Sequence, residues 1–260
     1  MRFASLGSGS EGNALVVEAA SGHTTTRVLL DCGFSAKELD RRLARLQLGI
    51  DALDAIVITH EHSDHIGSAL TLARKWSLPL YMSWGTAKAV GAESDDIDLH
   101  VLLGDETAAI GDLEVLPYTV PNDAREPLQF VFSDGVRRLG VLTDVGTSTP
   151  HITAMLSGCD ALVLECNHDA RMLATSRYPQ SLKARIGGSH GHLSNDAAAE
   201  ILAALDRSRL THVVAAHLSQ QNNLPELAQA ALANVLGSAQ EEVRVASQEL
   251  GFDWIGCGAA

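Results

Sequence analysis

The sequence predicts an α/β protein in which β-sheets are sandwiched between helices. The chain has 260 residues with 46% apolar side chains, enough to bury a substantial core. Strand and helix patterns alternate at both ends of the sequence, whereas the middle contains successive hairpin-like strands, a combination typical of layered α/β architectures. No Pro/Gly/Ser-rich linker or internal repeat divides the chain, so we expect residues 1–260 to form one domain.

The first elements are strands followed by a helix. Strands are expected at residues 2–6, 14–18 and 27–31, and a glycine-rich loop at 7–13 joins the first two. That loop leads into a strand and lacks the Lys-Ser/Thr pair of a P-loop, so it is not a nucleoside-triphosphate signature. Ser35 and Glu38 have capping-box spacing. Apolar residues then recur at helical spacing, at Leu39, Leu43, Leu46 and Ile50.

The remaining elements follow from short apolar runs and from helical periodicity. Further strands are expected at residues 55–58, 80–82, 113–118, 129–132, 139–143, 161–165, 213–216 and 243–245. Helices are expected at 66–76, 196–205 and 225–236.

The segment 59–65 (THEHSDH) places three imidazoles and one carboxylate within six positions, directly after an apolar strand. His60 and His62 are two apart in an extended loop, so their side chains can converge on one ion. Asp64 and His65 fall near the expected helix start and point elsewhere, which indicates a second ion. Two divalent ions about 3.5–4 Å apart can turn a shared water into a nucleophile near neutral pH. The alternative is a solvated polar turn with a helix-capping aspartate.

Further ligand-type residues occur at the ends of distant strands. Asp144, Glu165 and His217 each end or follow a predicted buried strand, as His60 does. Because sites in layered α/β proteins gather beyond the carboxyl ends of strands, we expect these residues to meet at one edge. The alternatives are a turn or N-cap aspartate for Asp144 and a buried histidine satisfied by the backbone for His217.

The formal net charge of −13 argues against a broad nucleic-acid footprint, since binding to phosphates depends largely on Lys and Arg. Residues 169–192 are locally positive, with Arg171, Arg177, Lys183 and Arg185 against Asp169. This stretch is either a local nucleic-acid contact or an ordinary solvated face.

Four cysteines without CxxC spacing indicate reduced packing residues rather than a metal cluster: Cys32, Cys159, Cys166 and Cys257. The chain starts without a signal-peptide pattern and contains no apolar run long enough to span a bilayer. We therefore expect a cytoplasmic protein without membrane contact; the sequence makes no prediction of oligomeric state.

The order His-x-His-x-Asp-His, then Asp144, then His217 resembles the metallo-β-lactamase-fold hydrolases. Four segments are similar to the YycJ/WalJ type within that superfamily: residues 6–13 (LGSGSEGN), 165–169 (ECNHD), 191–195 (GHLSN) and 216–223 (AHLSQQNN). The resemblance extends over nearly the whole chain. It implies an αββα sandwich with two central mixed sheets flanked by helices, a dinuclear centre of Zn²⁺ and/or Mn²⁺, and a nuclease that acts from 5′ ends on DNA or RNA.

The resemblance also implies a role for each candidate ligand. His60 and His62 would bind the first metal, and Asp144 would bridge both metals. The second metal would be bound by Asp64, His65 and His217, with Asp64 also orienting the nucleophile. One position departs from the family pattern, because Asn122 stands where a histidine usually completes the first site. An amide oxygen is a weaker ligand, so this site should hold zinc less tightly and accept manganese more readily, unless Asp123 substitutes.

Four further residues are candidate contacts to substrate. By similarity to the ribonuclease J group, His192 would hold the scissile phosphate or protonate the leaving oxygen; the alternative is simple packing before a helix cap at Ser194. His168, Asn222 and Arg185 are candidate substrate-binding residues. The alternatives are that His168 braces a metal ligand and that Asn222 fixes the loop behind His217.

Two other functions fit the same motif. A thioester hydrolase of the glyoxalase II kind would use the same activated water, although it has no need of the segment around His192. A metal-stabilised nucleic-acid-binding protein without catalytic activity would result if the first site had decayed at Asn122. A flavin-coupled diiron enzyme of this fold would have Glu in place of His62, so the motif argues against redox chemistry.

Overall fold

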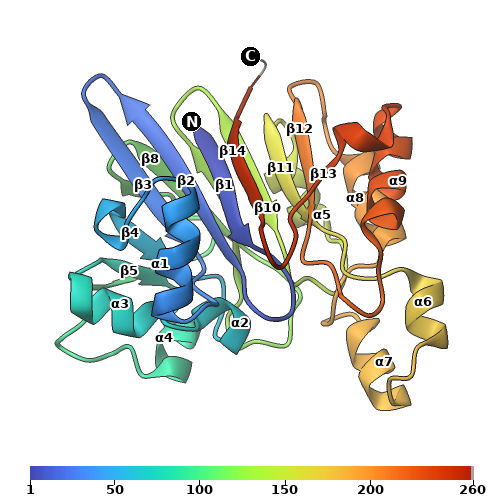
Figure 1. The fold of residues 1–260 in the computed structure, drawn as a ribbon, viewed down its shortest axis with the longest axis horizontal. Helices are drawn as coiled ribbons and strands as arrows, with labels where there is room; N and C mark the ends of the chain where they lie inside the picture. The colour runs from blue at the N-terminus through green and yellow to red at the C-terminus, as the bar shows by residue number, and fades with distance from the viewer. Residues whose placement is uncertain (259–260) are drawn as a thin grey trace.

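The computed structural model describes residues 1–258 as two seven-stranded mixed sheets packed face to face, with helices on their outer sides (Figure 1). The strand order is β14-β1-β2-β3-β4-β5-β6 in the first sheet and β13-β12-β11-β10-β9-β8-β7 in the second. The sequence of layers is helix, sheet, sheet, helix. The predicted αββα sandwich is confirmed.

The first sheet is built from the N-terminal half of the chain and one C-terminal strand. Its strands are β1 (Arg2–Gly7), β2 (Ala14–Ser21), β3 (Thr24–Leu30), β4 (Ala55–Val57), β5 (Leu80–Met82), β6 (Leu99–Val101) and β14 (Phe252–Gly256). The helices beside it are α1 (Ala36–Arg45), α2 (Ser63–Ile66), α3 (Ala69–Trp76) and α4 (Trp84–Val90), and a short 3₁₀ turn, η1, covers Ile50–Ala52. Strands β3 to β6 run parallel, so their carboxyl ends share one edge.

The second sheet contains β7 (Ala108–Ile110), β8 (Leu113–Thr119), β9 (Leu128–Ser133), β10 (Arg138–Leu142), β11 (Ala161–Glu165), β12 (His212–Ala216) and β13 (Arg244–Val245). Its outer side is covered by α5 (Pro150–Leu156), α8 (Asn195–Ala204) and α9 (Pro225–Leu236), and a second 3₁₀ turn, η2, covers Gln240–Glu242. Helices α6 (Ala170–Thr175) and α7 (Gln180–Ile186) project below the sandwich at the lower right of Figure 1. Strands β10 to β13 are parallel.

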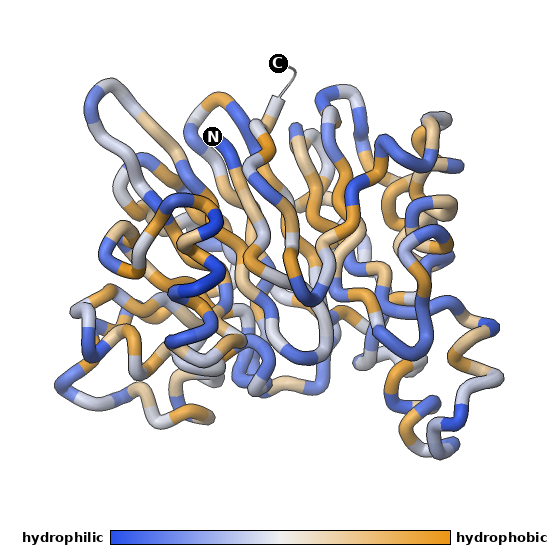
Figure 2. Tube along the Cα trace, viewed as in Figure 1, coloured by the Kyte–Doolittle hydropathy of each residue, from blue (hydrophilic) through white to orange (hydrophobic). Residues whose placement is uncertain are grey.

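Three apolar clusters stabilise these layers. The central cluster fills the space between the sheets and includes Phe3, Val17, Phe130 and Val163, all buried. The other two lie between each sheet and its helices. Figure 2 shows the apolar residues concentrated along the strands. Burial on both faces explains why the central strands appear in the sequence as continuous apolar runs rather than alternating ones.

The predicted helix 66–76 was wrong at its start. The chain forms two helices there, α2 and α3, because Gly67 breaks the helix with φ +30°. A Cβ at Gly67 would collide with the carbonyl oxygen of Cys32, so a close backbone approach dictates the break. Helix α2 therefore begins at Ser63, three residues before the predicted helix start, and it contains Asp64 and His65.

Other elements were missed or only partly anticipated. Ser35 does cap α1 by accepting from the Glu38 N–H, but the Glu38 carboxylate accepts from Arg41 and Arg42. The expectations omitted strands β6, β7 and β14 and helices α4 to α7, all short. The four cysteines are free and buried, as predicted. Within residues 1–258, no helix has the length and apolar character needed to cross a membrane.

Candidate metal centre and active site

The turn after β4 brings His60 and His62 together. His60 Nε2 lies 3.0 Å from His62 Nδ1. Two nitrogens that bind one tetrahedral zinc at about 2.0–2.1 Å would be about 3.3 Å apart, so this pair has the separation of two ligands of one ion. Burial and the neighbouring His65 lower the pKa of His60 well below its usual value, which keeps the imidazole neutral and able to bind a cation.

Asp31, at the end of β3, fixes the orientation of two of these rings. The Asp31 carboxylate lies 2.7 Å from His65 Nδ1 and accepts a hydrogen bond from the Thr59 hydroxyl, which lies 2.9 Å from His60 Nδ1. With each Nδ1 donating, Nε2 carries the lone pair in both rings. Asp31 thus sets the tautomer that a metal ligand needs.

Asp144 and His217 reach the same place from the second sheet. Asp144 follows β10 with φ +53°, and His217 follows β12 with φ +55°. Asp31 after β3 has φ +59°. Non-glycine residues rarely adopt this left-handed conformation, and such residues concentrate at functional sites.

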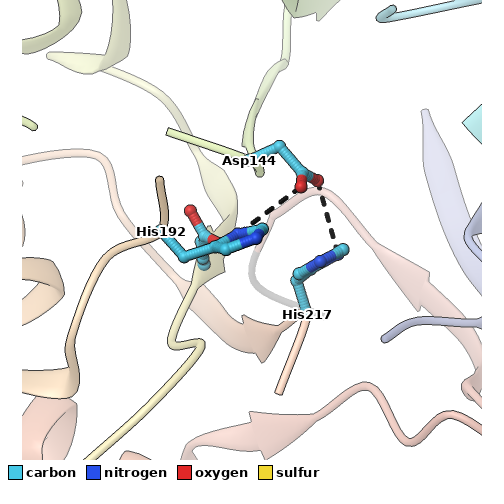
Figure 3. A group of neighbouring side chains, drawn as sticks. Asp144, His192 and His217 are labelled. Atoms are coloured by element: carbon cyan, nitrogen blue, oxygen red, sulfur yellow. Dashed lines mark hydrogen bonds and ion pairs between the residues drawn. The ribbon is translucent and has the colours of Figure 1, made fainter. Parts of the chain in front are cut away.

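The ends of β10 and β12 lie at one edge of the sheet, so their ligand-type side chains converge. Asp144 Oδ2 is 2.9 Å from His65 Nε2. The same oxygen is 3.4 Å from His217 Nδ1 (Figure 3). Asp64 Oδ2 lies 3.5 Å from His65 Nε2. These contacts join six of the predicted residues into one cluster, the metal cluster: His60, His62, Asp64, His65, Asp144 and His217.

The surroundings of the Asp144 carboxylate show whether the cluster is suited to bind cations. Its side chain is buried, and its Oδ2 has no hydrogen-bond donor within residues 1–258, although two imidazole nitrogens are close. Burial alone would raise the pKa of Asp144, but His217 and His65 hold it well below its usual range, so the carboxylate is ionised. An ionised carboxylate that is buried needs a cationic partner, and a divalent ion between its Oδ2 and His65 Nε2 would supply one in place of a proton. The residues present fit divalent metal ions.

The glycine-rich loop between β1 and β2 contacts His65 and His217. Asn13 Oδ1 accepts from the Gly9 N–H and lies 3.2 Å from His217 Nδ1, while Asn13 Nδ2 lies 3.2 Å from His65 Nε2. The Ser8 hydroxyl accepts from the backbone N–H of His217. The loop therefore helps to position these two histidines. Sequence reasoning missed Asp31, Ser8 and Asn13, although Asp31 carried the same signal as Asp144, a carboxylate directly after a strand.

The predicted weak point lies at Asn122. Its Nδ2 donates to the Asp144 carbonyl at 2.9 Å, and its Oδ1 accepts from the Ala124 N–H at 2.8 Å. Both polar atoms of the Asn122 side chain are thus hydrogen-bonded to backbone groups. A ligand role for Asn122 stays a prediction. Asp123 Oδ1 lies 3.3 Å from His62 Nε2, on the side of the ring opposite His60, and Asp123 Oδ2 accepts from Arg185 at 2.8 Å.

His192 lies beside the metal cluster. Its Nδ1 is 2.8 Å from Glu165 Oε1, and Glu165 Oε2 accepts from the Val145 N–H. His192 Nδ1 is also 3.5 Å from Asp144 Oδ1 (Figure 3). Burial lowers the pKa of His192, but Glu165 and Asp144 outweigh it and raise the pKa to about 9. Glu165 therefore holds the ring through Nδ1 and leaves Nε2 as the free nitrogen, while Ser194 caps α8 as predicted.

A cavity of about 390 Å³ adjoins the cluster. Its lining includes five residues of the cluster region: His62, Asp64, Asp144, His192 and His217. It also includes Asn122, Asp123, Tyr178, Leu182, Arg185, Ile186 and His190. This volume lies in the usual range for small-molecule sites.

Two of the predicted substrate contacts lie outside this cavity lining. His168 is buried, and burial together with His192 lowers its pKa to about 4. Asn222 is also buried, and its backbone carbonyl accepts from the Asp169 N–H. Asn222 Nδ2 lies 3.4 Å from the Ser219 hydroxyl, a position that fits its alternative role in the loop after His217. His168 Nδ1 has no hydrogen-bond partner within residues 1–258, so both roles of His168 stay predictions.

A two-sheet sandwich with this cluster at its edge defines a class, the metal-dependent hydrolases. A family model described as a β-lactamase superfamily domain matches residues 26–217. The chain is 37% identical to exodeoxyribonuclease YycJ of Bacillus anthracis over 91% of its own length and 89% of the relative's. It is 32% identical to exodeoxyribonuclease WalJ of Streptococcus pneumoniae, with 94% and 91% covered. The Zn²⁺-bound PqqB of Methylobacterium extorquens has the same fold, with a TM-score of 0.75 at 17% identity over 98% and 100% of the two chains.

The chain belongs to the β-lactamase superfamily and, within it, to the family of YycJ and WalJ. Members of this superfamily use divalent metal ions, and the metal cluster supplies donors for them.

Proposed function

We propose that the protein is a metal-dependent 5′ to 3′ exonuclease whose main substrate is DNA. The observation that carries this proposal is the placement of His192, which Glu165 holds next to a cluster of donors for two cations. A thioester hydrolase needs the cluster but not a positioned imidazole beside it. The relatives that match over most of the chain are named exodeoxyribonucleases, which supports DNA over RNA.

In this proposal His60 and His62 would hold the first ion, Asp64, His65 and His217 would hold the second, and Asp144 would contribute to both. When bound, the two ions would activate a water molecule and neutralise charge on the phosphoryl oxygens. Zn²⁺ and Mn²⁺ are the candidates. The hydrogen bonds that Asn122 makes to the backbone favour a first position that is weak for zinc and tolerant of manganese.

The protein's own groups orient the substrate and handle the proton. Asp64 lies at the cavity wall, where its carboxylate can orient the attacking water. His192, fixed through Nδ1, would present Nε2 to the scissile phosphate or donate a proton to the leaving oxygen. Arg185 lines the cavity and can attract a neighbouring phosphate. We expect this activity in the cytoplasm.

A side-by-side assay tests the proposal. The protein is loaded with Zn²⁺ or Mn²⁺, the metals per chain are counted, and turnover is measured on 5′-phosphorylated single-stranded DNA, the matching RNA, a phosphodiester dye and a thioester. Asp64→Ala and His192→Ala are the inactive controls. We expect DNA cleavage that His192→Ala reduces by about 10²–10⁴-fold. Turnover of the thioester alone would refute the nuclease assignment, and binding of DNA without any turnover would favour the non-catalytic alternative.

A further inference from the structure

Helix α7 has an apolar stripe that packs on no core. None of the α7 residues is buried, yet Leu182 and Ile186 both line the cavity beside the metal cluster. Tyr178, four residues before Leu182, lines the same cavity. Leu182 and Ile186 are four apart in α7 and therefore lie on one face of the helix. Tyr178 precedes the helix and joins them only as part of the cavity lining. We call these three side chains the α7 wall. Apolar groups that stabilise no core and face a catalytic cavity are available for a ligand.

The α7 wall is firmly attached to the catalytic side. The backbone N–H of His192 donates to the Ile186 carbonyl at 2.8 Å. A Cβ at Gly191 would collide with the carbonyls of Arg185 and Ile186, and a Cβ at Gly146 would collide with the backbone at Ser189. These close backbone approaches hold the segment after α7 against the loop that follows β10. The wall therefore has a defined position relative to His192.

The charges around the α7 wall indicate what it binds. The chain has a net charge of −13, but the α6–α7 projection carries Arg171, Arg177, Lys183 and Arg185. Arg185 and His190 line the cavity together with the wall. The cavity thus combines donors for cations, basic groups and a partly exposed aromatic ring. A nucleotide matches this combination, because it has a phosphate at one end and a flat apolar base at the other.

We propose that the α7 wall is the platform on which the base of the terminal nucleotide rests, with Tyr178 stacking on the base. This inference rests on the proposed exonuclease function and specifies its substrate. Stacking on an aromatic ring accepts every base, so the platform selects ends that carry a base without selecting a sequence. Leu182 and Ile186 extend the apolar surface beside the ring.

Kinetics on two substrates test the platform. Tyr178→Ala removes the ring, and Tyr178→Phe keeps the ring without its hydroxyl. Each is assayed on a 5′-phosphorylated oligothymidylate and on the same strand with an abasic first residue. On the normal strand we expect Tyr178→Ala to raise KM about tenfold with kcat nearly unchanged, and Tyr178→Phe to match the wild type. On the abasic strand the wild type and Tyr178→Ala should have the same KM, because the ring has no base to contact.

The outcomes separate this proposal from the nuclease assignment. If the wild type cleaves DNA and Tyr178→Ala leaves KM on the normal strand unchanged, the platform is wrong and the nuclease stands. The same holds if Tyr178→Ala raises KM equally on the normal and abasic strands. If the wild type cleaves neither strand but turns over the thioester, the nuclease assignment fails and the platform with it. Circular dichroism and metal content of Tyr178→Ala check that the fold and the metal cluster are intact.

Discussion

The two sides of the metal cluster are built differently. On the second-metal side His65 and His217 are buried and contacted by Asp31, Asn13 and Ser8. On the first-metal side His60 is supported by Thr59, but the His62 side chain is 33% exposed and touches only His60 and Asp123 among polar partners within residues 1–258. Asp144 lies between the sides. The comparison teaches that the second position is pre-organised and the first is adaptable.

This difference follows from where the supporting residues sit in the fold. The second-metal side is held by the end of β3 and by the loop between β1 and β2, both fixed by the first sheet. The first-metal side is contacted by the loop 122–124, where the Asn122 side-chain amide forms hydrogen bonds with backbone groups. Asp123 of this loop contacts His62 and is paired with Arg185 of the projecting helix α7. We therefore expect the second position to fill at lower metal concentration and the first to respond to substrate.

Removal of the shared ligand should have the largest effect. Asp144→Asn would weaken both metal positions, and we expect nuclease activity to fall about a thousandfold or more, beyond the roughly 10–100-fold typical of outer-shell changes. Without metal the variant should be less stable than the metal-free wild type near neutral pH, because the lowered pKa of Asp144 means that its charge favours the folded state. Metal counting, kcat/KM and thermal melting check this. A variant that kept both metals and its activity would contradict the role of Asp144.

Asp31→Asn should act on the pre-organised side. The amide can no longer accept from both His65 Nδ1 and the Thr59 hydroxyl. We expect metal affinity to fall roughly 10–100-fold at the second position, which His65 serves directly, and less at the first, which Asp31 reaches only through Thr59 and His60. Equilibrium dialysis with Zn²⁺ measures this. Asp96→Asn, which changes an exposed carboxylate paired with Arg74, is the matched control and should leave metal affinity unchanged. Equal loss at both positions would show that the two sides are not independently supported.

Only some residues of the second-metal side could be predicted from the sequence. The ligands in residues 60–65 were predictable because they are neighbours in the chain, and Asp144 and His217 because each follows a strand. Asp31 was missed since its role depends on the parallel pairing of β3 with β4, which sequence does not reveal. The same applies to the break at Gly67, which results from a contact with Cys32.

The projecting helices α6 and α7 were not predicted from the sequence for a different reason. Helices α6 and α7 have six and seven residues, and the apolar side chains of α7 face the cavity rather than the core. Periodicity arguments assume that apolar residues mark burial. Where apolar residues serve a ligand instead, the pattern is too short and too exposed to predict a helix.

Asn122→His should reduce the difference in metal affinity between the first and second positions. A histidine would supply the imidazole that relatives of this fold are expected to have, and we expect about tenfold tighter Zn²⁺ binding at the first position with less tolerance for Mn²⁺. The ratio of activities with Zn²⁺ and Mn²⁺ measures the change. Asn122→Ala is the control, since it removes the backbone hydrogen bonds without adding a ligand. If Asn122→His and Asn122→Ala behaved alike, the asymmetry would have another origin.

Asp123→Asn should have the smallest effect. Asp123 contacts His62 Nε2 on one side and Arg185 on the other, and its side chain is 37% exposed. Exposed ion pairs are weak and screened by salt, so we expect first-position metal affinity to fall only about two- to fivefold. The loss should shrink further in 1 M salt, whereas the loss caused by Asp31→Asn should persist because that carboxylate is buried. Dialysis at two salt concentrations separates the two cases, and equal salt dependence would show that Asp31 and Asp123 support their histidines in the same way.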